Sequence, residues 1–292
     1  MRVERRGEVL GGVLVAISGL SFGTLSVFNR QLAAAGLTVP QMLFLRFLGG
    51  ALVLWSLALA RREVRRLPVG RLLGFGALGL LYVAEAWLYF ESSQRIPIAL
   101  TALLLYLFPS LVVLATWALD RRPPERRALV ALAFATLGIA FAVGSPTGRL
   151  DLVGLGLGAG TALVYTVYVL LGAKVQPGVG PAFGSAVLMT IAALGFGAAA
   201  FAQGQLDFSG AHDAWPSVLG LVVIGTAVPI PLLLFGMTRI GAARASIIST
   251  LEPISAALCG LALGETLTPL QLVGAGLVVG GVVLASSANA PR

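Results

Sequence analysis

Charged residues are scarce in this sequence: 11% of its 292 residues are Asp, Glu, Lys or Arg, whereas 58% are hydrophobic. A soluble domain carries about 25% charged residues, because its surface must be wetted. Most of this protein's surface must therefore face something other than water. A bilayer crossing needs about 20 apolar residues, so the chain has room for about ten crossings with short connections and for no separate globular domain.

Cysteine and histidine are also nearly absent, since Cys259 and His212 stand alone. This excludes an internal disulfide and makes a structural zinc or haem site unexpected, so we expect neither metal nor cofactor. No Gly-Lys pair is followed by Ser or Thr, which argues against a P-loop and against ATP-driven pumping by this chain alone. The shortage of His, Cys and acidic side chains also argues against a membrane-embedded enzyme.

The formal net charge of +8 could suggest nucleic-acid binding, but the basic residues lie in clusters between apolar runs. Such clusters mark cytoplasmic loops in membrane proteins. If the N-terminus is cytoplasmic, sixteen of the twenty basic residues fall on the cytoplasmic side and three on the opposite side, while Arg46 lies within a span. The cytoplasmic set is Arg2, Arg5, Arg6, Arg61, Arg62, Arg65, Arg66, Arg71, Arg121, Arg122, Arg126, Arg127, Lys174, Arg239, Arg244 and Arg292; the opposite set is Arg30, Arg95 and Arg149.

Apolar segments broken by charge clusters, Pro and Gly predict ten membrane helices. They cover residues 9–34, 39–60, 68–91, 96–119, 126–144, 149–172, 181–202, 214–237, 241–263 and 268–287. The first segment could be a signal peptide, but it is longer than a typical signal core and contains Asn29 and Arg30. We therefore expect it to be the first membrane helix, with both termini in the cytoplasm.

The two halves of the chain repeat each other. A shift of 144 residues pairs Arg95-Ile96 with Arg239-Ile240, Leu107 with Leu251, and Pro109 with Pro253. We therefore predict two five-helix repeats, 1–145 and 149–292, that form one structural unit with a central cavity. Because five is odd, the second repeat is inverted in the membrane, which is the usual architecture of secondary transporters.

Glycines spaced four apart, such as Gly276 and Gly280 in the last segment, let membrane helices approach closely. Packing within the chain is the favoured interpretation, and a dimer interface on the last helix is the alternative. We therefore expect a monomer or a homodimer.

The segment at 236–239, continuing through Ser249-Thr250-Leu251-Glu252-Pro253 to 263–268 and 271–275, resembles the closing part of the drug/metabolite transporter superfamily. Within it the sequence is similar to the EamA family, whose members carry two five-helix units, and especially to the YddG-type amino-acid exporters. The first half matches in 44–47 and in 95–109, and departs where Asp120-Arg121 replaces the Gly264-Glu265 of the second half. The resemblance covers nearly the whole chain and implies export of amino acids, other metabolites or drugs.

Three ionisable residues, Arg46, Glu85 and Glu252, lie deep within predicted spans. Such groups are costly in a membrane, about 2.5–3.5 kcal/mol on insertion scales, and usually face a cavity or a partner. At helical spacing Tyr82, Glu85 and Tyr89 share one face. Glu85 is predicted either to be paired internally or to line a cavity, where it could meet a substrate ammonium or exchange a proton.

Three prolines indicate breaks in two of the predicted helices. Pro253 follows Glu252, and its missing N–H frees carbonyls for which Ser249, Thr250 or an ion pair with Arg46 could compensate. Pro229 and Pro231 should interrupt another span at the position that the 144-residue shift equates with Glu85. Broken helices of this kind commonly form transporter sites, although a kink without ligand contact is the alternative.

The predicted site follows from these patterns, and tyrosines complete it because they pair an apolar face with a hydroxyl. For each tyrosine, core packing or the interfacial aromatic belt is the competing interpretation. The predicted cavity residues are Tyr82, Glu85, Tyr89, Tyr106, Tyr165, Tyr168, Pro229 and Thr250; Glu85, Glu252 and Arg46 are candidates for proton coupling or a structural ion pair, and Pro229, Pro231 and Pro253 for helix breaks.

The sequence thus predicts an all-α integral membrane protein of the cell inner membrane that exports amino acids, aromatic ones included, or similar small metabolites by alternating access. Its expected partners are a small-molecule substrate and the lipid bilayer, and not nucleic acid. The alternative is a multidrug exporter of the same fold acting on lipophilic cations. A purely structural subunit is disfavoured by the deep carboxylates and the inverted repeat.

Overall fold

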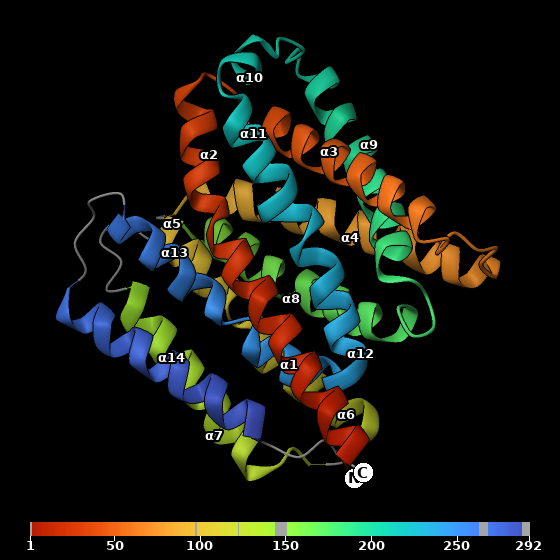
Figure 1. The fold of residues 1–292 in the computed structure, drawn as a ribbon. Coiled ribbons are helices and arrows are strands. Elements are labelled where there is room, and N and C mark those ends of the chain that lie inside the picture. Colours follow the sequence, from red (N-terminus) through yellow and green to blue (C-terminus); the bar gives the residue numbers. More distant parts are fainter. Residues whose placement is uncertain (1, 97, 122, 144–150, 263–267, 288–292) are drawn as a thin grey trace.

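The computed structural model describes residues 2–96, 98–121, 123–143, 151–262 and 268–287, and these ranges contain helices and no β-strand (Figure 1). Six stretches of helix in the described part are long and apolar enough to cross a bilayer. The helices are α1 (Arg2–Gly23), α2 (Leu25–Ala34), α3 (Val39–Ala60), α4 (Val69–Ser93), α5 (Ile98–Leu105), α6 (Phe108–Asp120), α7 (Arg126–Val143), α8 (Leu152–Val175), α9 (Pro181–Ala202), α10 (Ser209–Asp213), α11 (Trp215–Val222), η1 (Val223–Ala227), α12 (Pro229–Ile248), α13 (Leu251–Ala262) and α14 (Pro269–Ser287).

The predicted spans 39–60 and 181–202 coincide with α3 and α9, and α4, α7, α8 and α14 agree with prediction to within a few residues. Local sequence also specifies where a helix starts, as the capping residue of α8 shows. Asp151 accepts hydrogen bonds from the N–H groups of Val153 and Gly154 at the start of α8 (2.7 and 3.3 Å). Gly264-Glu265, Arg122, Arg149 and Arg292 lie outside the described residues.

Three of the predicted spans, 9–34, 96–119 and 241–263, are each divided in the structure. Pro109 lies in the first turn of α6 and Pro253 in the first turn of α13. A proline cannot donate to the carbonyl four residues before it, and its ring obstructs the preceding turn. In the first span the division falls at Thr24, whose hydroxyl donates to the Ser21 carbonyl at 2.7 Å and so competes with the helical pattern.

The eighth predicted span contains a π-helical turn, η1, directly before Pro229. Val228 N–H donates to the Val223 carbonyl, five residues back, at 3.0 Å. Because Pro229 has no N–H, the carbonyl of Gly225 loses its usual helical donor. A π-turn inside a membrane helix therefore leaves a backbone acceptor that another group must satisfy.

Gly241 lies within α12 and kinks it, because its φ of 79° is incompatible with continued helix. Side chains with a Cβ rarely adopt this left-handed region, whereas glycine does so readily. The boundary between the eighth and ninth predicted spans, expected at 238–240, therefore falls at Gly241, within α12.

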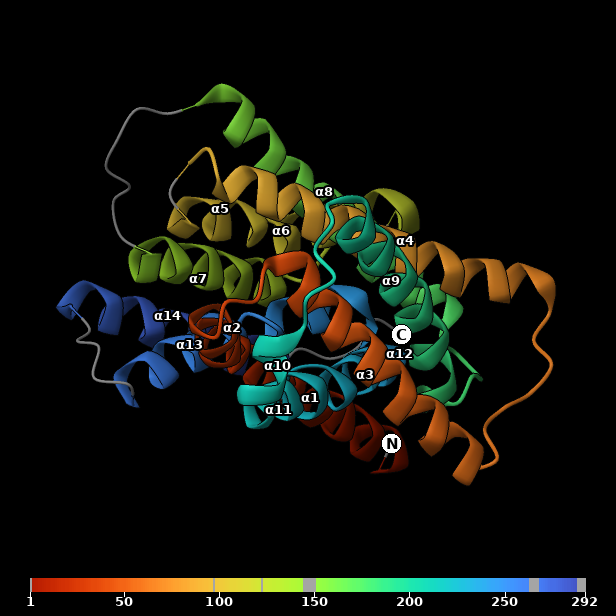
Figure 2. The ribbon, with the colours of Figure 1, turned by 90° about the horizontal axis from the view of Figure 1, so that it is seen from above.

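The long helices pack in four pairs, α1 with α12, α4 with α8, α3 with α9, and α7 with α14 (Figures 1 and 2). Glycines allow these close approaches. A Cβ placed on Gly11 of α1 would lie 2.6 Å from the Arg239 Cβ, and one placed on Gly154 of α8 would lie 2.8 Å from the Arg95 Cβ. The 144-residue shift pairs Arg95 with Arg239, and Gly11 and Gly154 lie 143 residues apart, so the two contacts correspond in the two halves.

Two loops tie α3 and α9 together at opposite ends of this helix pair. The Glu63 carboxylate, from the loop after α3, accepts from the N–H groups of Ala182 and Phe183 at the start of α9 (3.0 and 3.3 Å). At the other end, the Thr38 hydroxyl, at the start of α3, donates to Gln205 Oε1 in the loop after α9 (2.7 Å). Each loop thus satisfies polar groups at the start of the partner helix.

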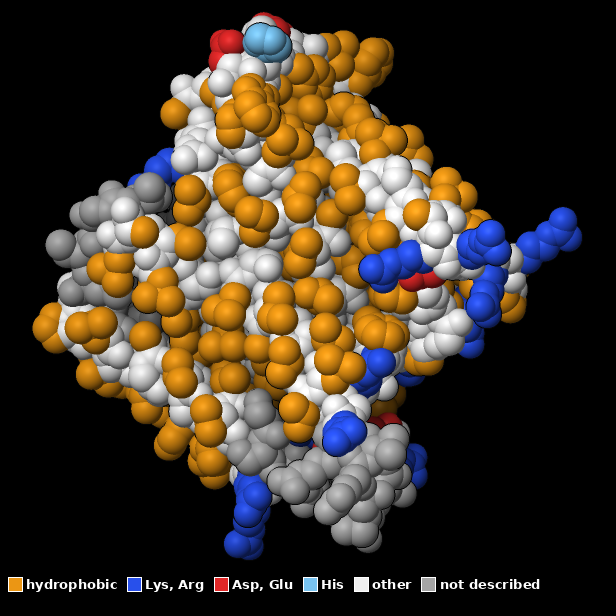
Figure 3. Space-filling model, in the orientation of Figure 1, with side chains coloured by type: hydrophobic (Ala, Val, Ile, Leu, Met, Phe, Trp, Pro, Cys, Tyr) orange, Lys and Arg blue, Asp and Glu red, His pale blue; other side chains and the backbone are white. Residues whose placement is uncertain are grey.

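The surface is apolar over most of the face shown in Figure 3, as a lipid-facing surface requires. Leu52, Leu80, Leu163 and Leu194 are all more than half exposed. Basic side chains gather at the lower and right edges, whereas Asp213 and His212 of α10 lie at the opposite end. This asymmetry is that expected between the two faces of a membrane protein.

Candidate functional site

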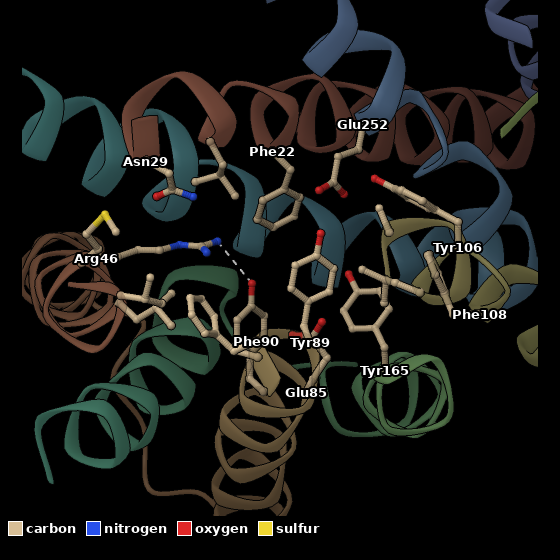
Figure 4. Close-up of a pocket in the computed structure, with 18 of the residues that line it drawn as sticks. Phe22, Asn29, Arg46, Glu85, Tyr89, Phe90, Tyr106, Phe108, Tyr165 and Glu252 are labelled. Carbon is tan, nitrogen blue, oxygen red and sulfur yellow. Dashed lines mark hydrogen bonds between the residues drawn. The ribbon is translucent and has the colours of Figure 1, made fainter. Parts of the chain in front are cut away.

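A cavity of about 500 Å³ lies between α1, α2, α3, α4, α5, α6, α8 and α13 (Figure 4). Aromatic and aliphatic side chains form most of its wall, and a few polar ones converge on it, as in small-molecule sites generally. It is lined by Phe22, Leu25, Asn29, Arg30, Ala33, Val39, Met42, Leu43, Arg46, Tyr82, Glu85, Ala86, Tyr89, Phe90, Ala102, Leu105, Tyr106, Phe108, Tyr165 and Glu252.

Arg46 is held rigidly against the π-turn. Its Nε donates to Thr226 Oγ1 at 2.9 Å, and its Nη2 donates to the Gly225 carbonyl at 3.3 Å and to the Tyr82 hydroxyl at 3.2 Å. The Gly225 carbonyl is the one that lacks its usual helical hydrogen bond, because Pro229 has no N–H. The guanidinium therefore compensates for the break in the helix and at the same time borders the cavity.

Glu85 is buried, with 9% of its surface exposed, and lines the cavity floor below Tyr89 (Figure 4). Tyr82, Glu85 and Tyr89 all border the cavity, as their spacing on one helix face predicts. Glu85 has no hydrogen-bond partner or ion pair among the described residues. A carboxyl group in this position faces the cavity and not a partner in the helix bundle.

Glu252 enters from the first turn of α13, on the other side of the cavity from Arg46 (Figure 4). The hydroxyls of Tyr89 and Tyr106 point toward its carboxylate in this view. Within the described part of the chain, Arg46 forms no ion pair of 4.0 Å or less with Glu252 or Glu85. The structure thus presents the basic and acidic groups to the cavity separately.

An aromatic cluster supports one wall. Phe108 meets Tyr165 edge-on at 4.7 Å between ring centroids, and Tyr165 stacks on Tyr168 at 5.4 Å. Tyr168 in turn meets Tyr82 edge-on at 5.5 Å. Because these rings support one another, the orientations of Tyr82 and Tyr165 are fixed by packing.

Three of the residues predicted for the cavity lie outside its lining. Tyr168 is fully buried behind Tyr165 and Tyr82. The Pro229 carbonyl accepts a hydrogen bond from Ser18 at 2.8 Å, and the Thr250 hydroxyl donates to the Ile247 carbonyl at 2.6 Å. The Pro229 and Thr250 groups therefore stabilise the helix breaks beside the cavity, whereas Tyr168 packs within the aromatic cluster.

Sequence reasoning missed the contribution of the first span. Phe22, Leu25, Asn29 and Ala33 all border the cavity. Asn29 is a polar residue inside an otherwise apolar segment, and its spacing from Phe22 places both on one helix face. That pattern could have identified this wall.

A second hollow of about 300 Å³ adjoins the cavity and shares Val39, Leu43, Ala86 and Phe90 with it. It extends to Thr38, Gln203 and Gln205, the loop groups at one end of the α3–α9 pair. The cavity therefore continues toward the end of the molecule that carries α10.

The EamA-like transporter family matches this sequence twice, over residues 9–144 and 152–287. The chain belongs to this family. It is 32% identical to an uncharacterized transporter of Archaeoglobus fulgidus over 276 residues, which cover 94% of this chain and 96% of that protein. It is 30% identical to the threonine/homoserine exporter RhtA of Escherichia coli K12 over 280 residues, which cover 91% of this chain and 87% of that protein.

A solved crystal structure has the same fold, with a TM-score of 0.78 at 20% identity over 94% of this chain and 96% of its own. Membership of the EamA family makes this chain a multi-pass membrane transporter and not an enzyme. The predicted resemblance to this family is confirmed, whereas a place in the YddG-type branch stays a prediction.

Proposed function

We propose that this protein exports small amino acids or similar polar metabolites across the inner membrane by alternating access through the cavity of Figure 4. The observation that carries the proposal is a cavity at membrane depth that holds Arg46, Glu85 and Glu252 without ion pairs between them among the described residues. Charges at this depth are tolerated where they serve a polar solute. The similarity to a threonine/homoserine exporter supports the same substrate class.

Alternating access requires two units that can rock about a shared site, and we infer that residues 1–145 and 149–292 are these units, as inverted five-helix repeats. Two observations support this. The family matches each half separately, and the close approach of Gly11 to Arg239 has its counterpart in that of Gly154 to Arg95.

The placement of basic residues supports an orientation with both termini in the cytoplasm. In that orientation the hollow at Thr38 and Gln205 lies toward the cell exterior, and the loop contacts of Glu63 lie toward the cytoplasm. We propose on this basis that the conformation is outward-facing. Glu85 is the proposed group for coupling export to protons.

The test is counterflow in liposomes that contain the purified protein, with labelled threonine, homoserine, phenylalanine and tryptophan, and with Glu85→Gln in parallel. Saturable exchange of one or more amino acids supports the proposal. Exchange of phenylalanine or tryptophan would show that the cavity also accepts larger side chains. Loss of exchange in Glu85→Gln places this carboxyl in the working cavity.

A multidrug exporter is the second candidate, because the lining combines two carboxylates with an aromatic wall that suits lipophilic cations. Tetraphenylphosphonium serves as the probe in the same liposomes. Movement of this cation, together with no flux of any amino acid, overturns the amino-acid proposal in favour of the drug exporter.

A further inference from the structure

Two opposite charges face each other across one cavity and are not paired with each other. Arg46 enters from α3 and Glu252 from α13, on opposite sides of the space in Figure 4. An unpaired charge at membrane depth loses hydration without compensation. A bound solute that carries both charges would compensate both groups at once.

The Arg46 guanidinium is already oriented for such a solute. Its Nε and Nη2 are engaged by Thr226, Gly225 and Tyr82, whereas Nη1 has no hydrogen-bond partner within the described ranges. Packing of the guanidinium over the Phe47 ring, 5.0 Å from its centroid, fixes it further. A donor that is already held rigidly loses little conformational entropy when it binds a carboxylate.

The Glu252 carboxylate supplies the negative charge that an ammonium group would bind. In the described part of the chain it has neither a hydrogen-bond donor nor an ion pair, and the hydroxyls of Tyr89 and Tyr106 point toward it (Figure 4). An ammonium group has three donors and can bind a carboxylate and adjacent hydroxyl oxygens together. Glu85 is less suited, because it lies on the floor of the cavity, below Tyr89.

From this geometry we propose that the cavity binds the zwitterionic backbone of an α-amino acid in one orientation, with the carboxylate at Arg46 Nη1 and the ammonium at Glu252, Tyr89 and Tyr106. This assignment rests on the proposed export function. It makes the two backbone charges the main determinants of recognition, so compounds with one charge are poor ligands even when the rest of the molecule is unchanged.

The test compares threonine with two analogues that each lack one charged group. 3-Hydroxybutyrate lacks the amine, and 1-amino-2-propanol lacks the carboxylate. Competition against labelled threonine is measured on purified protein in nanodiscs. We expect each analogue to bind at least about tenfold more weakly than threonine, the cost of losing one hydrogen-bonded charge.

Two variants test which residue binds the ammonium and which binds the carboxylate of the amino acid. In Glu252→Gln threonine affinity falls about tenfold or more, while 3-hydroxybutyrate affinity changes little, so the preference for the amine disappears. In Arg46→Gln the preference for the carboxylate disappears instead. Arg46 also supports the π-turn, so Arg46→Gln is checked by size-exclusion chromatography. If it misfolds, the Glu252→Gln result decides, because Glu252 has no described partner to lose.

Glu85→Gln is the matched comparison for the binding preference, since it removes the same charge from the same cavity. Whatever its effect on exchange, it is expected to keep the ranking of threonine over both analogues. Equal affinity of wild-type protein for threonine and either analogue, or loss of the amine preference in Glu85→Gln and not in Glu252→Gln, overturns this inference alone. Absence of binding by any amino acid overturns the proposed function and this inference with it.

Discussion

Removing the Thr226 hydroxyl tests whether Arg46 and the π-turn stabilise each other. Thr226 Oγ1 accepts from Arg46 Nε at 2.9 Å and donates to the Leu221 carbonyl at 2.7 Å, and the side chain is fully buried. In Thr226→Val the shape is nearly conserved, but a charged donor and a backbone acceptor lose their partner. A hydrogen bond to a charged group contributes about 1.5–3 kcal/mol, so we expect a loss of about 2 kcal/mol.

For a chain of this size, a loss of 1 kcal/mol lowers the melting temperature by roughly 2–4 °C. Thr226→Val should therefore lower the melting temperature of the detergent-purified protein by roughly 4–8 °C. It should also weaken substrate binding, because Arg46 loses one of its anchors. Thermal unfolding followed by fluorescence, and the threonine competition assay, measure the two effects.

Thr161→Val is the matched control. Thr161 is equally buried, but among the described residues its hydroxyl bonds only to the Leu157 carbonyl of its own helix, at 3.0 Å. We expect a change of at most about 1 kcal/mol there, within the net value of one neutral hydrogen bond. If Thr226→Val and Thr161→Val shift the melting temperature equally, the contact with Arg46 contributes nothing and the reasoning is refuted.

Three further predictions concern the scaffold, each measured by thermal unfolding. Gly11→Ala should cost about 1–3 kcal/mol by overpacking, because the added Cβ would lie 2.6 Å from the Arg239 Cβ. Gly241→Ala should cost about 1 kcal/mol of backbone strain, since φ there is 79°. Glu63→Ala should cost about 0.5–2 kcal/mol, the usual value of a lost helix cap, because the Ala182 and Phe183 N–H groups lose their acceptor.

Glycines in open surroundings provide controls for the first two substitutions. Gly12 adjoins Gly11, but a Cβ there would have only Ile248 Cδ1 nearby, at 3.9 Å. Gly276 lies in α14 and would meet nothing within 4 Å. Alanine at either position should be neutral or slightly stabilising. For Glu63, Glu63→Gln keeps an acceptor oxygen and should recover part of the lost stability, whereas equal losses in both variants would contradict the capping role.

The positions of the long helices could be predicted from sequence because they depend on local composition. A run of about 20 apolar residues specifies a membrane span wherever it occurs, and α3 and α9 agree with their predicted bounds. The same local reasoning identified Arg46, Glu85 and Glu252, since an ionisable residue within an apolar run is visible without tertiary information.

The divisions within spans were harder to predict. Proline marks a tendency to break, but where the helix breaks depends on which neighbouring groups satisfy the freed carbonyls. At Pro229 the outcome is a π-turn, and the donor to the Gly225 carbonyl comes from Arg46, 179 residues away in sequence. At Thr24 no proline marks the division at all.

What the sequence by itself determined is therefore the class of protein, the membrane spans and the deep charged residues, because each follows from hydrophobicity over a short window. Only the tertiary structure decided which residues share the cavity. It placed Phe22 and Asn29 in the lining and Tyr168, Pro229 and Thr250 behind it. It also separated Arg46 from Glu252. These facts depend on how helices far apart in the chain rotate and pack, and local hydrophobicity does not encode that rotation.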